Sequence, residues 1–167
     1  QQLGQQYVPP KLVRFSGVIN SGCGTAQSAM GPFYCPADQK VYIDTAFFKD
    51  MRTQMGIGGE QNQTELARQD QAGDFAQAYV VAHEVGHHIQ TILGISEQVQ
   101  KARAQGSKAQ GNALSVRQEL QADCLAGVWA HHNNQRTQFL EQGDVEEAMD
   151  AAHKIGDDYL QKRATGQ

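Results

Sequence analysis

The sequence lacks a long apolar run and a cluster of basic residues. None of its hydrophobic stretches approaches the ~18 consecutive apolar residues of a membrane-spanning helix. Its 14 lysines and arginines are outnumbered by 18 acidic residues, which gives a net charge of −4. Because no basic run stands out, nucleic acid is not an expected partner. The 167 residues suit one domain with a buried core, and we predict a tail over 1–11 and a single domain over 12–167.

Cysteine is also scarce, with 3 in the chain. Cys23 and Cys35 flank a segment rich in glycine and serine. A disulfide between them would close a short loop, stabilise the fold by ~2–3 kcal/mol and imply an oxidising compartment; two free thiols are the alternative. Zinc binding by this pair is less favoured, because no second pair completes a tetrahedral set. Cys124 is expected to be a small buried residue.

The clearest chemical signal is the segment His83-Glu84-Val85-Gly86-His87, inside a predicted amphipathic helix over 75–92. Residues one helical turn apart share a face, so the side chains of His83 and His87 lie about 5–6 Å apart. That spacing suits two imidazoles that bind one zinc ion at about 2.0–2.1 Å each. Glu84 lies beside the metal without binding it, as a general base that takes a proton from zinc-bound water requires.

A third metal ligand is expected from a second helix, predicted over 112–131. Glu119 and Asp123 are one turn apart there, so both carboxylates face the same way. A catalytic zinc usually has three protein ligands, and Glu119 would complete that set. Asp123 would then accept a hydrogen bond from the other ring nitrogen of His83 or His87 and orient that ring.

Positions next to the motif restrict the alternatives. Gln90 and Leu93 occupy the glycine and third-histidine positions of the H-E-x-x-H-x-x-G-x-x-H motif, which excludes that ligand scheme. His88 lies about 100° around the helix from His87, so it is not expected to bind the metal. Gly86 costs roughly 1 kcal/mol relative to alanine in a helix, which predicts a close neighbour at that point.

The remaining secondary structure is predicted from alternation and capping residues. Strands are expected over 12–19 and 40–44, with an edge segment over 31–36 that its prolines exclude from the centre of a sheet. Helices are expected over 44–56, 75–92, 96–105, 112–131 and 144–156, capped by Asp44, Asp74, Ser96, Asn112 and Asp144. Residues 57–73 and 106–111 are expected to be loops.

Several segments make the sequence resemble the bacterial neutral zinc metallopeptidase family, which is grouped with the thermolysin-like peptidases (gluzincins). The matching segments are residues 21–24, 31–36, 41–44, 73–88, 114–123 and 155–158. The resemblance implies that His83, His87 and Glu119 bind one Zn²⁺ per chain. It implies Glu84 as the catalytic base and Asp123 as the residue that orients a ligand.

The same resemblance implies a small α+β, zincin-like fold. A short N-terminal β-sheet packs on the zinc-motif helix and is followed by a mainly helical C-terminal lobe. Thermolysin-like enzymes pair the substrate with an edge strand, which the segment before Cys35 or its neighbouring strand would supply. Family members usually carry an N-terminal membrane anchor, which this chain lacks. We therefore expect an extracytoplasmic domain (periplasmic or cell-envelope) of a membrane-anchored protein, with Cys23 bonded to Cys35.

The resemblance implies a zinc-dependent endopeptidase that acts on a peptide or protein substrate, although the family defines no particular one. The tetrahedral intermediate needs a second electrophile besides zinc. Thermolysin-like enzymes take it, a histidine or tyrosine, from the C-terminal part of the chain. His131, His132, His153 and Tyr159 are the available residues, and the sequence does not rank them.

Two other functions are considered. A zinc-stabilised binding module without turnover would use the same ligands. A di-iron helical bundle would use Glu-x-x-His pairs from two helices, here Glu84 with His87 and a degraded pair, Asp150 with His153. The bundle leaves His83 without a role, and the N-terminal strands do not belong in it.

Overall fold

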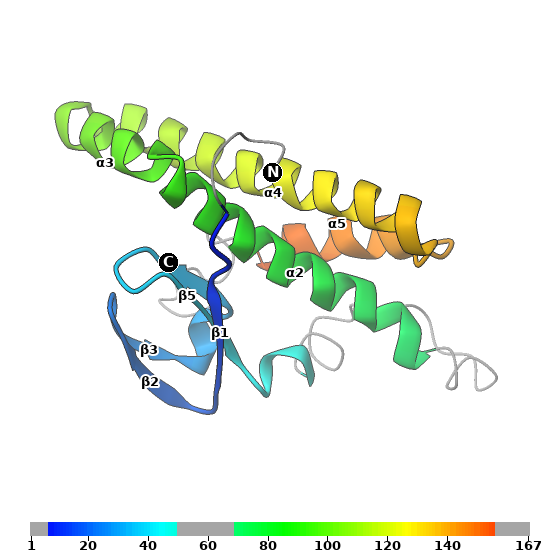
Figure 1. The fold of residues 1–167 in the computed structure, drawn as a ribbon. Helices are drawn as coiled ribbons and strands as arrows, with labels where there is room; N and C mark the ends of the chain where they lie inside the picture. Colours follow the sequence, from blue (N-terminus) through cyan, green and yellow to red (C-terminus); the bar gives the residue numbers. More distant parts are fainter. Residues whose placement is uncertain (1–6, 50–68, 156–167) are drawn as a thin grey trace.

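A computed structural model describes residues 7–49 and 69–155, which form an α+β fold (Figure 1). Small β-sheets at the N-terminal end lie beside a group of long helices, as the α+β expectation requires. The strands are β1 (Lys11–Phe15), β2 (Val18–Ser21), β3 (Gly24–Gln27), β4 (Phe33–Cys35) and β5 (Lys40–Asp44), with a 3₁₀ turn, η1 (Ser28–Met30). The helices are α2 (Gln69–Ile92), α3 (Ile95–Gln105), α4 (Lys108–Thr137) and α5 (Asp144–Ile155).

β5 is the central strand of a three-stranded sheet with the order β1-β5-β4. It pairs parallel with β1 and antiparallel with β4. Its residues from Val41 to Asp44 are all buried, as expected for a strand covered on both faces. The predicted edge position of 31–36 is confirmed for β4, which has β5 as its one neighbour in this sheet.

The predicted strand over 12–19 is wrong in one respect, because the structure divides it into β1 and β2. Gly17 has a φ of 79°, a left-handed conformation that interrupts the extended chain. β2 then pairs antiparallel with β3 in a separate two-stranded sheet. A disulfide joins Cys23, in the turn of this hairpin, to Cys35 at the end of β4. The two small sheets are therefore covalently linked.

The predicted start of three helices is wrong, although the helices themselves are present. α2 begins at Gln69, so part of the predicted loop over 57–73 is helical and Asp74 is not its cap. α3 follows Gly94, not a Ser96 cap. α4 begins after Ser107, which forms a capping box with Gln110, so the predicted cap at Asn112 lies inside the helix. The capping box satisfies the backbone N–H groups of Ser107 and Gln110 at the start of the helix.

The C-terminal half shows two further differences. α4, predicted to run to about His131 or beyond, ends at Thr137. α5 begins at the predicted Asp144, but the carboxylate of Asp144 accepts a hydrogen bond from the Glu141 N–H at 2.8 Å and not the expected capping-box bond. Cys124 is exposed on α4, not buried as predicted.

α2 is the central element and contacts α3, α4, α5, β4 and β5 (Figure 1). It approaches α4 closely at Gly86, where an added Cβ would lie 3.0 Å from the backbone of Ala122. The predicted close neighbour of Gly86 is therefore confirmed. The neighbouring interior of the helical part consists of small residues of α4 packed on aromatic residues of α2: Phe75, Tyr79, Ala126, Ala130 and Ala148 of α5.

Asp44 joins three parts of the sheet region through its buried carboxylate. It accepts hydrogen bonds from Gly17 N–H at 2.9 Å, from Ala46 N–H at 2.6 Å and from the Ser28 hydroxyl. The bond to Ala46 is the cap predicted for the helix over 44–56. Residues 47–49 are helical, and the rest of that helix lies outside the described residues.

We expect Gly86→Ala to lower the free energy of unfolding by ~1–3 kcal/mol, because the methyl group would collide with the α4 backbone and force the helices apart. Gly127→Ala is the matched control, since an added Cβ there meets nothing within 4 Å. That substitution should be neutral or stabilise by ~0.5–1 kcal/mol through helix propensity. Urea unfolding of both variants measures the difference. Equal effects would show that the helices do not approach closely at Gly86.

We expect Asp44→Asn to destabilise the protein by ~1–3 kcal/mol at pH 7, because three donors lose a charged acceptor. Burial raises the pKa of Asp44, but its hydrogen bonds from Ser28, Ala46 and Gly17 outweigh burial and lower the pKa below its usual range. A lowered pKa stabilises the fold fully above the unfolded-state value of about 3.9, and that stabilisation is lost as pH falls through the folded-state value. The stability difference between wild type and variant should therefore shrink below about pH 4. A pH-independent difference in urea midpoint would contradict this account.

Candidate metal centre

Three polar atoms from two helices form a nearly equilateral triangle. The Nε2 atoms of His83 and His87 lie 3.1 Å apart. Glu119 Oε2 lies 3.2 Å from the first and 3.3 Å from the second. Within the described ranges, 7–49 and 69–155, these residues are the one group of at least three potential ligands close enough to share a metal ion. The structure thus brings together the three residues that the sequence predicted as ligands.

The dimensions and chemistry of this triangle fit zinc. Ligand atoms at about 2.0–2.1 Å from a tetrahedral zinc ion are separated by about 3.3 Å, close to the three separations observed. Two imidazole nitrogens and one carboxylate form a common donor set for catalytic zinc, which keeps its fourth position open. A hard cation such as Mg²⁺ would prefer oxygen donors. The donors therefore fit zinc better than magnesium or calcium.

The opposite nitrogen of each imidazole is held by a hydrogen-bond acceptor. His83 Nδ1 lies 2.8 Å from Asp123 Oδ1, which also accepts a bond of 2.6 Å from the Tyr79 hydroxyl. His87 Nδ1 lies 2.9 Å from Gln90 Oε1. A ring that donates Nδ1–H to an acceptor has its Nε2 lone pair available. Both rings are therefore held in the tautomer and orientation that a metal requires.

The charged groups of the cluster shift one another's pKa values, so that each charged form is favoured. Burial lowers the pKa of His83, but hydrogen bonds to Asp123 and Glu119 outweigh burial and raise that pKa to about 10. Burial raises the pKa of Glu119, but its bonds to His83 and His87 lower it to about 2. The pKa of Asp123 is also lowered, because bonds from His83 and Tyr79 outweigh burial. Both carboxylates are thus ionised at neutral pH, and the cluster attracts a cation once the imidazoles release their protons.

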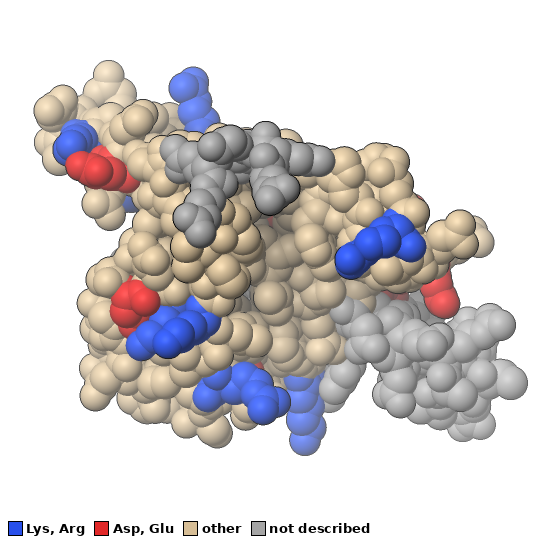
Figure 2. All heavy atoms as spheres, viewed as in Figure 1, with Lys and Arg blue, Asp and Glu red and all other residues tan. Residues whose placement is uncertain are grey.

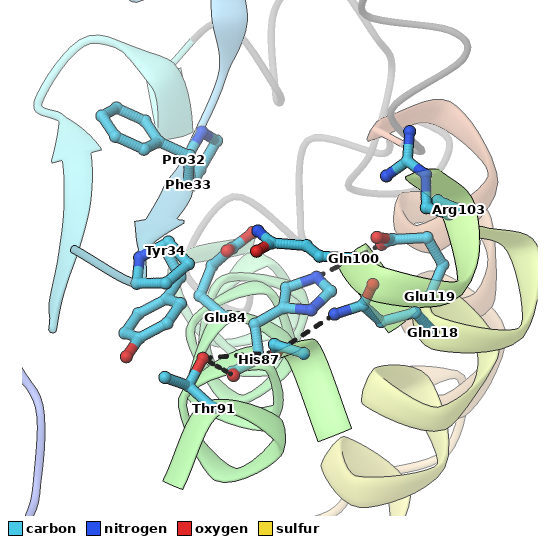
Figure 3. A pocket seen from close by; sticks show the side chains of 12 residues that line it. Pro32, Phe33, Tyr34, Glu84, His87, Thr91, Gln100, Arg103, Gln118 and Glu119 are labelled. Atoms are coloured by element: carbon cyan, nitrogen blue, oxygen red, sulfur yellow. Dashed lines mark hydrogen bonds and ion pairs between the residues drawn. The ribbon is translucent and has the colours of Figure 1, made fainter. Parts of the chain in front are cut away.

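A cavity of about 220 Å³ opens beside the triangle (Figure 3). Glu84, which is buried, lines it together with His87 and Glu119. Figure 3 shows Tyr34 and the neighbouring residues of β4 on one side, and residues of α3 and α4 on the other. The lining residues are Pro32, Phe33, Tyr34, Pro36, Glu84, His87, Thr91, Ser96, Gln100, Arg103, Gln118 and Glu119. Glu84 thus lies where a molecule entering the cavity would meet the metal ligands.

The residues considered as a second electrophile are not brought to this cavity. His131 and His132 are exposed on α4, and His153 is exposed on α5. None of the three lines the cavity. Tyr159 lies outside the described residues. His88 is not part of the candidate ligand group, as predicted. It is fully buried, and its Nε2 donates a hydrogen bond of 2.7 Å to the carbonyl of Val8.

Sequence reasoning missed two residues that hold the ligands in place. Tyr79 bonds to Asp123, and Gln90 connects His87 to α4 by donating to the Gln118 carbonyl at 2.7 Å. Helical spacing could have identified both residues from the sequence. Tyr79, His83 and His87 recur at intervals of one turn and Gln90 follows one turn later, so all four lie on one face of α2.

Comparison with known proteins places the chain in a family. A family model described as "Putative neutral zinc metallopeptidase" matches residues 1–167. The chain belongs to this family. It is 49% identical over 167 residues to "Uncharacterized protein YpfJ" of Escherichia coli K12, covering 100% of this chain and 53% of that protein. It is 42% identical over 170 residues to "Uncharacterized protein Rv2575" of Mycobacterium tuberculosis H37Rv, covering 96% of this chain and 52% of that protein.

The chain therefore spans about half the length of the curated relatives it matches. No solved structure matches it. The names of these relatives give no activity.

We expect Glu119→Ala to reduce zinc content sharply, because two ligands remain where three were available. Glu141→Ala removes an exposed carboxylate elsewhere and should leave zinc content unchanged. Elemental analysis after dialysis against a weak chelator measures both, with circular dichroism to confirm folding. Full zinc content in the Glu119 variant would remove this residue from the ligand set.

Proposed function

We propose that the chain is a zinc-dependent endopeptidase. His83, His87 and Glu119 hold one Zn²⁺, and Glu84 is the general base. The observation that carries the proposal is the triangle of ligand atoms at the edge of a cavity that also contains a buried carboxylate outside the ligand set. Its donor atoms suit zinc, and the family description names zinc and peptidase activity.

Zinc at this position would supply Lewis-acid polarisation of a substrate carbonyl and a water of lowered pKa. The chain's own residues then have separate tasks. Glu84 accepts a proton at its carboxylate and delivers it to the leaving amine. Asp123 and Gln90 keep the two imidazoles oriented through bonds to Nδ1. Because Gly86 leaves no space between α2 and α4, these contacts are held by tightly packed helices.

The site is proposed to be of the thermolysin-like (gluzincin) type. Its third ligand is a glutamate from a separate helix, and an aspartate one turn later bonds to a zinc-binding histidine. β4 is the edge strand beside the cavity, so an extended peptide could add to it through backbone hydrogen bonds. This placement supports a peptide or protein substrate lying along β4 above the metal.

The disulfide supports an extracytoplasmic location, in the periplasm or cell envelope, because such bonds persist in oxidising compartments. Among the described helices, none is long and apolar enough to cross a membrane. We retain a membrane anchor outside these 167 residues as a proposal from the family resemblance. On the face shown in Figure 2, lysine and arginine side chains are scattered among uncharged residues, which gives no support to nucleic acid as a partner.

The two alternatives differ in what the structure offers them. The di-iron reading gains no support, since neither Asp150 nor His153 belongs to the ligand group found in the described part of the chain. A zinc-stabilised binding module would share the whole ligand set. It differs from a peptidase in having no turnover, the step that would need Glu84.

Glu84→Gln is expected to abolish peptide cleavage while keeping zinc. Loss of a general base typically lowers kcat by about 10²–10⁴, and glutamine preserves the size of the buried side chain. Cleavage of a mixture of quenched fluorescent peptides by the zinc-loaded protein is the assay, with elemental analysis of zinc alongside. Glu146→Gln, at an exposed position of α5, is the control. Undiminished cleavage by the Glu84 variant would contradict the proposed base, and a wild type without any cleavage would favour the binding module.

A further inference from the structure

One face of α3 points into the cavity beside the metal ligands. Ser96, Gln100 and Arg103 all line that cavity. They recur at intervals of about one turn, so they form a single line along the helix. Two of them offer neutral polar groups, whereas Arg103 offers a positive charge. Figure 3 shows Arg103 and Glu119 on the same side of the cavity, opposite β4.

The antiparallel packing of α3 and α4 fixes where Arg103 lies relative to the metal ligands. Ser96 Oγ accepts a bond of 3.2 Å from Gln118, the residue before Glu119. At the other end of α3, Arg103 packs on Gly111, where an added Cβ would lie 3.8 Å from Arg103 Cγ. At 1.5 Å per residue, Arg103 is displaced by about 10 Å along the helix from the level of Ser96. That length matches about three residues of extended peptide.

The guanidinium of Arg103 is unpaired among the residues that the structure describes. No hydrogen bond or ion pair within residues 7–49 and 69–155 involves it. Lys101, two residues earlier, shows the contrasting case: its amine pairs with Glu97 at 2.6 Å on an exposed face of the same helix. Arg103 is also the basic residue in the last turn of α3, where the helix dipole favours a positive charge. Of these two basic residues of α3, Arg103 alone lines the cavity.

The cavity lining carries charges of both signs, because Glu84 and Glu119 of the metal site and Arg103 of α3 all border it. Gln100, the lining residue that precedes Arg103 on this face of α3, is neutral. A guanidinium presents paired N–H donors that match the two oxygens of a carboxylate. A molecule with a carboxylate some distance from its reacting carbonyl would therefore fit this cavity best.

We propose that Arg103 is a carboxylate-binding residue of the substrate cleft. The preferred substrates are peptides with a carboxylate within about three residues of the bond that is cleaved. That carboxylate belongs either to an aspartate or glutamate side chain or to the C-terminus of the peptide. The cleavage part of this inference rests on the proposed peptidase function, whereas the binding part does not.

The binding test uses three N-acetylated hexapeptides of one sequence and the zinc-loaded Glu84→Gln protein, which should bind without cutting. The first has glutamate at the third position and an amidated C-terminus, the second has glutamine there and an amidated C-terminus, and the third has glutamine and a free C-terminus. Isothermal titration calorimetry gives each Kd. We expect a carboxylate peptide to bind on the order of 10-fold more tightly than the uncharged one. Which of the two does so identifies the source of the carboxylate.

The same titrations with Arg103→Gln added should remove the preference. Lys101→Gln, which removes a charge of the same sign from the exposed face, should keep it. Arg103→Lys should retain part of it, because the charge remains but the paired donors are lost. Equal Kd values for all three peptides, no measurable binding of any, or a preference that survives Arg103→Gln would each overturn the proposal.

Kinetics with otherwise wild-type protein separate this inference from the proposed function. Quenched fluorescent versions of the three peptides should show a higher kcat/KM for a carboxylate peptide. Arg103→Gln should abolish the difference between the peptides, whereas Lys101→Gln should keep it. Cleavage of all peptides at one rate would overturn the role of Arg103 and leave the peptidase standing. An Arg103-dependent binding preference without any cleavage would sustain the carboxylate site and contradict the peptidase.

Discussion

The close crossing of α2 and α4 is the contact on which the site depends. Gly86 and Ala122 allow the two backbones to meet where a larger residue would separate them. The metal triangle draws two atoms from α2 and one from α4, and its sides are 3.1 to 3.3 Å. A displacement of either helix by even one ångström would change the two sides that join Glu119 to His83 and His87 by a large fraction. The small residues are therefore a condition for the ligand geometry, and not only for packing.

The orientation of the ligand side chains depends on the same helix packing, through hydrogen bonds. Asp123 comes from α4 and holds His83 of α2, while Gln90 of α2 holds His87 and reaches the backbone of α4. His83 is thus oriented directly by a contact between the helices, and the Gln90 side chain that orients His87 is itself held by α4. Burial alone would lower the pKa values of these histidines, but the acidic partners outweigh it and raise them. The fold keeps several charged groups close together, and a divalent cation is the species that would balance them.

The sequence was sufficient to predict which of these side chains share a helix face, because helical spacing is local. One turn relates His83 to His87 and Glu119 to Asp123, whatever the tertiary structure. It did not predict the start of α4, because Ser107 and Asn112 are both good capping residues and the choice was made by Gln110, which completes the capping box. It also did not show that α2 continues before Phe75, where polar residues and Gly73 resemble a loop.

The positions that depended on tertiary contacts were the least predictable. Exposure of Cys124 follows from which face of α4 turns toward α2, and composition favours burial for an isolated cysteine. The histidines proposed as electrophiles lie on exposed faces of α4 and α5, away from the cavity. Their distance from the site could not be read from spacing, because it depends on the direction in which whole helices run.

Two adjacent residues of α2 determine the two sides of the cavity. His87 supplies one corner of the metal triangle, and Gln90 connects it to α4 by hydrogen bonds. His88 points about 100° away and bonds through Nδ1 to the hydroxyl of Tyr34 on β4, at 2.9 Å. Because Nε2 of a neutral His88 donates to the Val8 carbonyl, its Nδ1 accepts a hydrogen bond from the Tyr34 hydroxyl. His88 thus links the edge strand β4 to α2, the helix that carries His83 and His87, and the cavity between them lies where a peptide strand could enter.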